Sequence, residues 1–290
     1  MAQTIACANQ KGGVGKTTTV VNLAAYLALA GKRVLIVDLD PQGNATSGFG
    51  IDRSALEVTL YDVLTGDTPM SETVLPTVVA GCSIAPASVS LAGAEVELAA
   101  ADQRERRFGR VLAPVLDSYD YILLDCPPSL GLLTVNALTA ADSVLIPTQC
   151  EYYALEGLSQ LTATLNLVRD NLNPALAIKG VVLTMYDART NLSADVAAEV
   201  RNHLGEAVFD TIIPRSVRLS EAPSFGLPIA LYRDSSRGAI AYAALAAELL
   251  SRDGRPAAPA EPAAGVASTS TAFGSAQRDE TRQLAVGGLR

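Results

Sequence analysis

The first apolar run of the chain, residues 4–8, leads directly into a glycine-rich segment that closes with a lysine and two threonines. This segment, residues 11–18, has the sequence KGGVGKTT, and a helical pattern over residues 18–30 follows it. Glycine lets the backbone curl so that successive N–H groups point inward, where they can hold phosphate oxygens. The beginning of the helix adds the positive end of its dipole. A strand, a loop of this kind and a helix in succession therefore indicate a phosphate-binding site.

Two side chains at the end of this loop suit a nucleotide that carries a magnesium ion. Lys16 would neutralise charge on the β- and γ-phosphates, and the hydroxyl of Thr17 would ligate Mg²⁺. The simpler interpretation is a glycine-rich turn with a solvated lysine. The strand before the loop and the helix after it favour the phosphate-binding interpretation.

The rest of the chain alternates between strand-like and helix-like patterns. Short apolar runs rich in Val, Ile and Leu indicate strands that are buried on both faces. They lie at residues 34–38, 121–125, 143–147, 178–184 and 211–213. Helical patterns lie at residues 131–141, 155–171, 193–204 and 236–250. This alternation predicts an α/β fold with a mostly parallel sheet and helices on both faces.

The composition changes after residue 251. Of the last 39 residues, 23 are Ala, Gly, Pro, Ser or Thr, and Phe273 is the single aromatic residue among them. Such a segment cannot bury enough apolar area to offset the entropy lost on ordering. We therefore expect a folded P-loop domain over residues 1–251 and a disordered tail over residues 252–290. The alternative for the end of the tail, residues 284–290, is a partner-binding peptide.

Charge and cysteine content argue against several other classes of protein. The net charge of −8 opposes a nucleic-acid partner if the charges are spread evenly. Four cysteines without CxxC spacing and a single histidine, His203, oppose a zinc site or a disulfide framework. The chain shows neither a leader-like start nor a long uncharged apolar window. We therefore expect a soluble cytosolic protein with reduced thiols.

The phosphate loop departs from the usual pattern GxxxxGK[ST] at its first positions. Gln10 stands where the first glycine is expected, and a second lysine, Lys11, follows it. KGGVGKTT is the deviant Walker A motif, and the chain resembles the ParA/Soj partitioning ATPases of the MinD/ParA group over nearly all of residues 1–251. The resemblance implies a P-loop NTPase that binds ATP through Lys11, Gly12, Gly13, Val14, Gly15, Lys16, Thr17 and Thr18. It also implies that Lys11, the signature lysine, crosses the interface of an ATP-sandwiched homodimer and stabilises charge on the transferring phosphoryl group.

Two aspartates complete the catalytic site that the resemblance implies. Asp40 follows the second expected strand and matches the catalytic aspartate of the family, which would orient the attacking water. Asp125 ends an apolar strand, as in a Walker B motif, and would hold Mg²⁺ through water. A turn-forming aspartate before Pro41 is the alternative for Asp40, and its place in a P-loop fold favours the catalytic role. The implied catalytic residues are Lys11, Lys16, Asp40 and Asp125.

Later segments resemble the ParA/Soj proteins more narrowly, and they imply contacts with adenine and with DNA. The segments are residues 151–157, 184–190 and 213–226. The resemblance implies adenine contacts at Met185 and Pro214. It implies non-specific DNA binding by the ATP dimer at Arg189 and Arg218. A single arginine is ordinarily a solvated surface charge, and the match to the family segments favours the DNA role here.

The resemblance implies an ATPase whose ATP-bound homodimer binds double-stranded DNA without sequence preference. A centromere-binding ParB-type protein would stimulate hydrolysis and release the dimer from DNA, and the protein would be cytoplasmic and nucleoid-associated. The tail lacks the amphipathic helix of MinD-like relatives, so we expect no membrane partner. Two alternatives remain open: an ATP-dependent positioning switch for another cargo without DNA binding, and a metabolic P-loop enzyme such as an amido-ligase.

The uneven distribution of charge changes the first interpretation of the net charge. Residues 1–33 carry a charge of +4, residues 34–178 a charge of −12, and residues 213–237 a local charge of +2. A monomer with this balance should bind DNA poorly, because most of its surface repels phosphates. A dimer that aligns two basic patches could bind DNA reversibly. The net charge is therefore a reason for DNA binding to require the ATP dimer.

Overall fold

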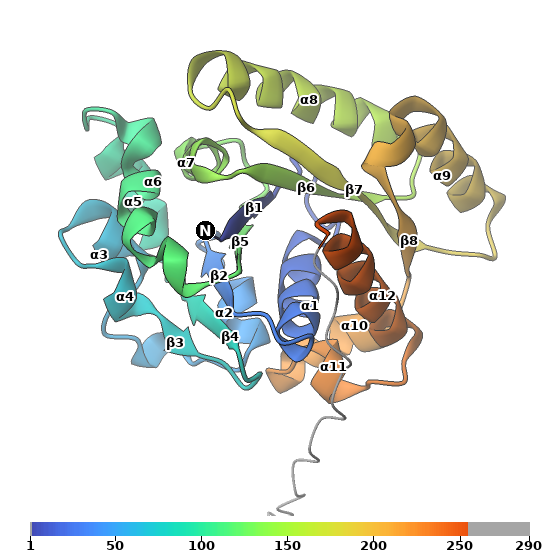
Figure 1. Ribbon diagram of the computed structural model, residues 1–290, viewed down its shortest axis with the longest axis horizontal. Helices are drawn as coiled ribbons and strands as arrows, with labels where there is room; N and C mark the ends of the chain where they lie inside the picture. The colour runs from blue at the N-terminus through green and yellow to red at the C-terminus, as the bar shows by residue number, and fades with distance from the viewer. Residues whose placement is uncertain (1, 255–290) are drawn as a thin grey trace, which may run out of the picture. The chain divides into compact units, whose positions relative to one another are not determined.

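The computed structural model describes residues 2–254, and within them eight strands form one sheet (Figure 1). The order of the strands is β3-β4-β2-β5-β1-β6-β7-β8. Neighbouring strands are parallel except for β3 and β4, which are antiparallel. The strands are β1 (Gln3–Cys7), β2 (Val34–Asp38), β3 (Leu75–Pro76), β4 (Cys82–Ala85), β5 (Tyr121–Asp125), β6 (Ser143–Gln149), β7 (Ala177–Tyr186) and β8 (Val208–Pro214).

Helices connect the strands and cover both faces of the sheet. The α-helices are α1 (Lys16–Leu29), α2 (Asn44–Gly48), α3 (Leu60–Thr65), α4 (Met70–Thr73), α5 (Leu91–Leu98), α6 (Arg107–Leu112), α7 (Leu132–Ala140), α8 (Ala154–Asn171), α9 (Asn191–Leu204), α10 (Val217–Glu221), α11 (Ile229–Tyr232) and α12 (Arg237–Arg252). The 3₁₀ helices are η1 (Arg53–Ala55), η2 (Arg104–Arg106), η3 (Ala113–Ser118), η4 (Gly205–Ala207) and η5 (Ala222–Phe225). The α/β fold with a mostly parallel sheet that the sequence predicts is therefore confirmed.

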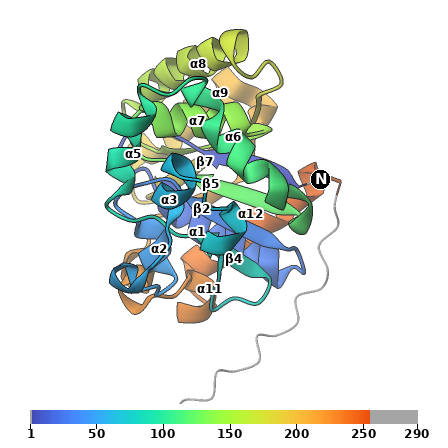
Figure 2. The same ribbon diagram turned by 90° about the vertical axis from the view of Figure 1, so that its left-hand side faces the viewer.

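Two hydrophobic cores lie on opposite faces of the sheet (Figures 1 and 2). Helices α3 to α9 pack on one face, and α1, α2 and α10 to α12 pack on the other. Successive strand residues point to opposite faces, so Ala6 and Leu35 join the first core while Ile5 and Ile36 join the second. Helix α1 is buried on most sides because it lies between the sheet and α12. The phosphate loop at its beginning is therefore mounted on a rigid support.

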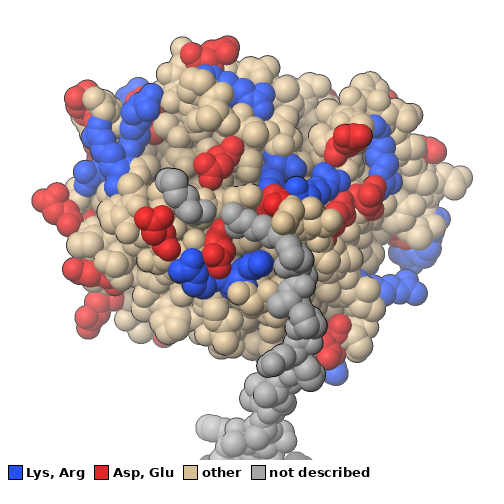
Figure 3. Space-filling view, in the orientation of Figure 1, with Lys and Arg blue, Asp and Glu red and all other residues tan. Residues whose placement is uncertain are grey.

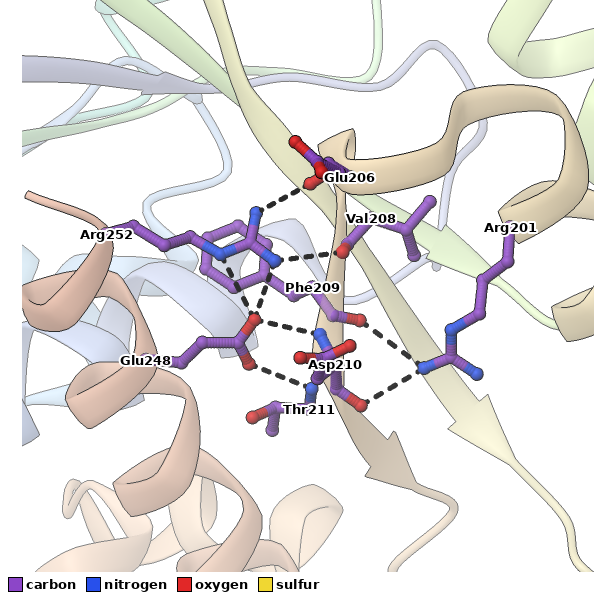
Figure 4. A network of polar contacts seen from close by, with 8 residues as sticks. All are labelled: Arg201, Glu206, Val208, Phe209, Asp210, Thr211, Glu248 and Arg252. Carbon is purple, nitrogen blue, oxygen red and sulfur yellow. Dashed lines mark hydrogen bonds and ion pairs between the residues drawn. The ribbon is translucent and has the colours of Figure 1, made fainter.

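Side chains cover the exposed edge of the sheet at β8 (Figure 4). The carboxylate of Glu248, in α12, accepts the backbone N–H groups of Asp210 and Thr211 at 2.8 and 2.9 Å. Arg252 donates to one backbone carbonyl in η4 and to one at the start of β8, and Arg201 donates to two further along β8. These bonds occupy backbone groups that an edge strand would otherwise offer to another chain.

The end of α12 is anchored to strands β5 and β7 of the sheet. Lys179 forms an ion pair with Asp253, and the hydroxyl of Tyr121 donates to the same carboxylate at 2.8 Å. Arg252 and Asp253 thus pack on the folded domain, although they fall in the tail expected from residue 252. Residues 255–290 of that expected tail lie outside the described residues.

Candidate nucleotide site

The phosphate loop joins the end of β1 to the beginning of α1. Gly13 and Gly15 have φ angles of +73° and +89°, in the region that favours glycine, and they give the loop its curl. Gly12 and Gly13 are exposed, whereas the side chain of Val14 is buried. The hydroxyl of Thr184, in β7, donates to the carbonyl oxygen of Val14 at 2.8 Å and fixes the loop from the side. The loop can therefore present backbone N–H groups to a phosphate.

Lys16 and Thr17 are the first two residues of α1. Lys16 is 7% exposed, which is low for a lysine, and Thr17 and Thr18 are half-buried. A buried ammonium group needs an anionic partner, since desolvation is costly for an unpaired charge. The phosphates of a nucleotide would supply that charge at the N-terminal end of the helix, where the dipole also favours an anion.

Three aspartates meet at the carboxyl ends of β2 and β5. Asp38 and Asp125 are paired in register across the two strands, and both are fully buried. Asp38 accepts the N–H and the hydroxyl of Thr46 at 2.8 and 2.7 Å, so it holds α2 in place. Asp40 is 7% exposed and accepts the N–H of Gln42 at 2.9 Å. The role of Asp40 as the catalytic aspartate stays a prediction.

The carboxylate of Asp125 is buried without hydrogen-bond partners of ordinary geometry among the described residues. Burial raises the pKa of Asp125 well above its usual range and the neighbouring Asp38 adds to this, while the Thr17 hydroxyl and Lys16 oppose it. A divalent cation would relieve the cost of this buried carboxylate, and Mg²⁺ prefers oxygen ligands. The residues present therefore fit Mg²⁺.

The donor set is also what a magnesium ion on a nucleotide requires. No group of three or more His, Cys, Asp or Glu side chains suited to a metal occurs in the described part of the chain. Mg²⁺ in nucleotide sites usually takes one or two protein oxygens and completes its shell with phosphates and water. Thr17 and Asp125 are of this kind. Their assignment as metal-binding residues stays a prediction.

Lys11, at the beginning of the loop, forms an ion pair that was not predicted from the sequence. Its N–H donates to Asn9 Oδ1 at 3.0 Å, and its Nζ lies 2.9 Å from Glu151 Oε2. Glu151 follows β6, and its side chain also accepts from the Gln149 amide. The two side chains are 40% and 44% exposed. Lys11 is thus at the rim of the loop, where a second molecule could reach it.

Met185 and Pro214 lie at adjoining strand ends. Tyr186 of β7 and Pro214 of β8 are paired in register, and the N–H of Arg215 donates to the carbonyl of Tyr186 at 2.9 Å. Met185 has a φ of +52°, which is uncommon for a residue other than glycine, and it directly follows Thr184, which contacts the loop. The structure brings the two residues together on the side of the phosphate loop. Their contact with adenine stays a prediction.

Arg189 and Arg218 are exposed, and each is paired with a carboxylate in its own segment. Arg189 lies between β7 and α9, 85% exposed, and its guanidinium is 2.6 Å from Asp187. Arg218 lies in α10, 52% exposed, and is 2.7 Å from Glu221. Neither carboxylate partner was predicted from the sequence. The short spacing between each arginine and its carboxylate, two and three residues, could have indicated these ion pairs.

Comparisons with known proteins decide the family. A family model described as an AAA domain matches residues 2–178. The sporulation initiation inhibitor protein Soj of Bacillus subtilis is 58% identical over 86% of this chain and 98% of its own length. The chromosome partitioning protein ParA of Myxococcus xanthus is 56% identical over 86% of this chain and 88% of its own length. This chain belongs to the ParA/Soj family. As a member, it is a P-loop ATPase of the partitioning group.

Solved structures place the ParA/Soj chain among nucleotide-binding proteins of the same fold. A structure of cobyrinic acid a,c-diamide synthase from Mycobacterium smegmatis with bound ADP and magnesium is 40% identical, with a TM-score of 0.77 over 89% of this chain and all of that chain. MinD from Pyrococcus horikoshii, complexed with Mg-ADP, is 29% identical, with a TM-score of 0.74 over 88% of this chain and 98% of that chain. Both relatives hold nucleotide and magnesium. Within residues 2–254, no helix has the length and apolar character needed to cross a membrane.

Proposed function

We propose that this chain is a DNA-segregation ATPase whose ATP-bound homodimer binds double-stranded DNA without sequence preference. The observation that carries the proposal is the position of Lys11, which lies at the rim of the phosphate loop in a half-exposed ion pair with Glu151. A lysine in this position can enter the site of a second protomer. The ATP-sandwiched dimer follows from that exchange, because each protomer would complete the site of the other.

Within the dimer, hydrolysis depends on orientation more than on a strong base. The loop from Gly12 to Thr18 and the ammonium group of Lys16 bind the phosphates of ATP. Thr17 and Asp125 would hold Mg²⁺, which when bound neutralises charge on the β- and γ-phosphates. Asp40 orients the attacking water, and Lys11 of each protomer stabilises the charge that develops on the other protomer's phosphoryl group. Loss of the γ-phosphate then removes the contact that joins the protomers.

The DNA surface is weak in the monomer, which fits a requirement for the dimer. Figure 3 shows one face on which basic and acidic side chains alternate without a continuous basic field. Arg189 and Arg218 each have a carboxylate within ion-pair distance. DNA phosphates must compete with these carboxylates, and a dimer doubles the number of arginines that can do so. Contacts to phosphates alone carry no sequence information, so binding is non-specific.

A centromere-binding ParB-type protein would be the partner that stimulates hydrolysis and so releases the dimer from DNA. Such a cycle places the protein in the cytoplasm on the nucleoid. The names of the Bacillus and Myxococcus relatives, which refer to Soj and to chromosome partitioning, support this proposal. By thermodynamic linkage, if DNA favours dimer formation by a given factor, the dimer binds DNA more tightly than the monomer by the same factor.

A gel-shift experiment with a DNA duplex of arbitrary sequence tests the proposal. The full chain should retard the duplex with ATP and Mg²⁺, and it should not do so with ADP or without nucleotide. Equal binding in all three conditions would contradict the ATP-dependent dimer. Absence of binding in all three would favour the alternative, an ATP-dependent positioning switch for another cargo.

The Mycobacterium smegmatis structure supports a second candidate, an amide-forming enzyme, because it is described as a diamide synthase at 40% identity. Such an enzyme uses ATP to activate a carboxylate substrate. A measurement of ATP hydrolysis without any carboxylic acid substrate distinguishes the two. Stimulation of this hydrolysis by DNA would indicate the partitioning ATPase.

A further inference from the structure

Two glycines bring the loop that follows Asp40 into direct backbone contact with the segment that carries Arg218. Gly50 follows α2 and Gly226 follows η5, and their φ angles are +73° and +64°. A Cβ atom added to Gly226 would lie 2.5 Å from the Cα of Gly50. A Cβ atom added to Gly50 would lie 3.2 Å from the carbonyl oxygen of Gly226. The two backbones touch with no side chain between them, an approach that glycine at both positions permits.

Gly50 is firmly connected to the nucleotide site. The N–H of Gly43 donates to the carbonyl of Asp40 at 2.8 Å, which closes the turn before α2. Thr46, in α2, is bonded twice to Asp38 at the end of β2. The N–H of Gly50 donates to the carbonyl of Ser47 at 2.9 Å. Residues 40–50 therefore form a short segment with its own hydrogen bonds, and this segment is attached to the carboxyl end of β2.

A second connection joins the phosphate-loop helix to the segment that carries Arg218. Asn22, buried in α1, accepts the N–H of Ile229 at 2.7 Å, and its amide donates to the carbonyl of Thr18 at 2.8 Å. Helix α1 lies against α11 (Figures 1 and 2), and α2 contacts η5, which lies between α10 and α11 in the chain. Residues 217–232, which we call the α10–α11 segment, thus rest on α1, whose first residues bind the nucleotide phosphates in the proposed function, and on α2, which follows Asp40 in the chain.

We propose that Gly50 and Gly226 are positioning residues that transmit the nucleotide state at Asp40 to the α10–α11 segment and thereby to its DNA-binding surface. The identity of the ligand as DNA rests on the proposed function. A contact between two backbones has no side chain whose rotation could absorb a displacement, so movement of one loop displaces the other. Loops that respond to a γ-phosphate are a common means of such switching.

The test compares two glycine substitutions that strain the backbone alike and differ in what the new side chain meets. Gly226→Ala pushes against Gly50, whereas Gly254→Ala, at a φ of +63°, meets no atom of the described residues within 4 Å. DNA affinity of the full chain is measured with ATP and with ADP by fluorescence anisotropy of a labelled duplex. The ratio of the DNA affinity with ATP to the DNA affinity with ADP should be the same in the wild type and in Gly254→Ala. In Gly226→Ala the ratio of these two DNA affinities should fall by about fivefold or more. The affinity of the protein for ATP itself should be unchanged.

A readout without DNA separates failure of this inference from failure of the proposed function. Amide hydrogen exchange of residues 217–232 should differ between the ATP and ADP forms in the wild type and in Gly254→Ala, and the difference should vanish in Gly226→Ala. If the wild type binds DNA equally with both nucleotides, the proposed DNA function is wrong, and exchange alone decides the coupling. A Gly226→Ala protein that keeps both the ratio and the exchange difference would overturn the coupling.

A milder substitution decides the matter if Gly226→Ala does not fold, as judged by circular dichroism. Gly50→Ala places its Cβ 3.2 Å from a carbonyl oxygen, so the two loops must separate by less. The affinity ratio and the exchange difference should then change in the same direction by a smaller factor. Wild-type values in a folded Gly50→Ala protein would overturn the coupling in that case.

Discussion

The ammonium group of Lys11 lies 2.9 Å from the carboxylate of Glu151, although 140 residues separate them. The pair joins the beginning of the phosphate loop to the turn that follows β6. Each side chain keeps about two fifths of its surface exposed, so solvent screens the pair and its free energy is small. In the proposed dimer Lys11 has to leave Glu151 to reach the other nucleotide. The pair therefore competes with dimer formation.

The substitution Glu151→Gln should strengthen the ATP-dependent dimer. An exposed ion pair contributes about 0.2–1 kcal/mol, and two pairs open for each dimer, so the dimer dissociation constant should fall by about 2- to 30-fold. Sedimentation equilibrium with ATP measures it, in an Asp40→Ala background that limits hydrolysis. Glu156→Gln, an exposed change on α8, serves as the control and should leave the constant unchanged. A weaker dimer in Glu151→Gln would show that this carboxylate supports the interface.

Lys16→Ala should remove most of the nucleotide affinity. Lys16 is buried at the start of α1, and the phosphates would supply its charged hydrogen-bond partner. Loss of such a bond costs about 1.5–3 kcal/mol, equivalent to a 10- to 150-fold higher dissociation constant for ATP. Titration with a fluorescent ATP analogue measures the change. Lys32→Ala, beyond the end of α1, is the control. Unchanged ATP affinity in Lys16→Ala would contradict the assignment of the loop.

Asp40 and Asp38 should give opposite results when each is replaced by alanine. Asp40→Ala should bind ATP and dimerise normally but turn over about 100-fold more slowly, because the attacking water loses its orientation. Asp38→Ala should instead lower the thermal midpoint, since Asp38 holds Thr46 through two bonds. Phosphate release assays and thermal unfolding measure the two effects. Wild-type turnover in Asp40→Ala would rule out its catalytic role.

The carboxylates beside the two DNA arginines should restrain DNA binding. Arg189→Glu or Arg218→Glu should weaken binding in ATP, whereas Asp187→Asn and Glu221→Gln should strengthen it, because the arginines are then free for phosphates. The affinity should fall with salt at a log–log slope of about −0.9 for each phosphate contacted, and each arginine variant should reduce that slope by about 1. Arg110→Glu, on α6, is the charge-matched control. A salt-independent complex would contradict binding through phosphates.

The parts of the fold that the sequence predicted best are those with the strongest local signal. The bounds of β2 and β5 were predicted to the residue, because each is a short apolar run that ends in an aspartate. Residues 44–118 were left without assigned elements. The strands there, β3 and β4, have two and four residues, and the α-helices have four to eight, so no periodic pattern develops.

The candidate site likewise contains residues that the sequence predicts and contacts that it does not. The phosphate loop and Asp125 follow from motifs, since their spacing along the chain determines their chemistry. The Lys11–Glu151 pair and the Gly50–Gly226 contact join residues that are far apart in the chain, and only the fold brings them together. The burial that raises the pKa of Asp125 is likewise a property of the packed sheet.

Glu248 should stabilise the edge of the sheet in a pH-dependent way. Partial burial raises the pKa of Glu248, but the N–H groups of Asp210 and Thr211 and the guanidinium of Arg252 outweigh this, so the net pKa is lowered. A carboxylate whose pKa is lower in the folded state stabilises the fold above its unfolded pKa, and this contribution is lost as the pH falls through the folded pKa. Glu248→Gln should therefore reduce the free energy of unfolding by about 1 kcal/mol at neutral pH.

The difference between the wild type and Glu248→Gln should narrow as the pH falls below about 4, where the unfolded carboxyl group is already protonated. Urea unfolding at a series of pH values measures it. Glu199→Gln, an exposed change on α9, is the control and should show a difference near zero throughout. A Glu248→Gln difference that stays constant down to acid pH would mean that the carboxylate acts at the edge by packing, without a role for its charge.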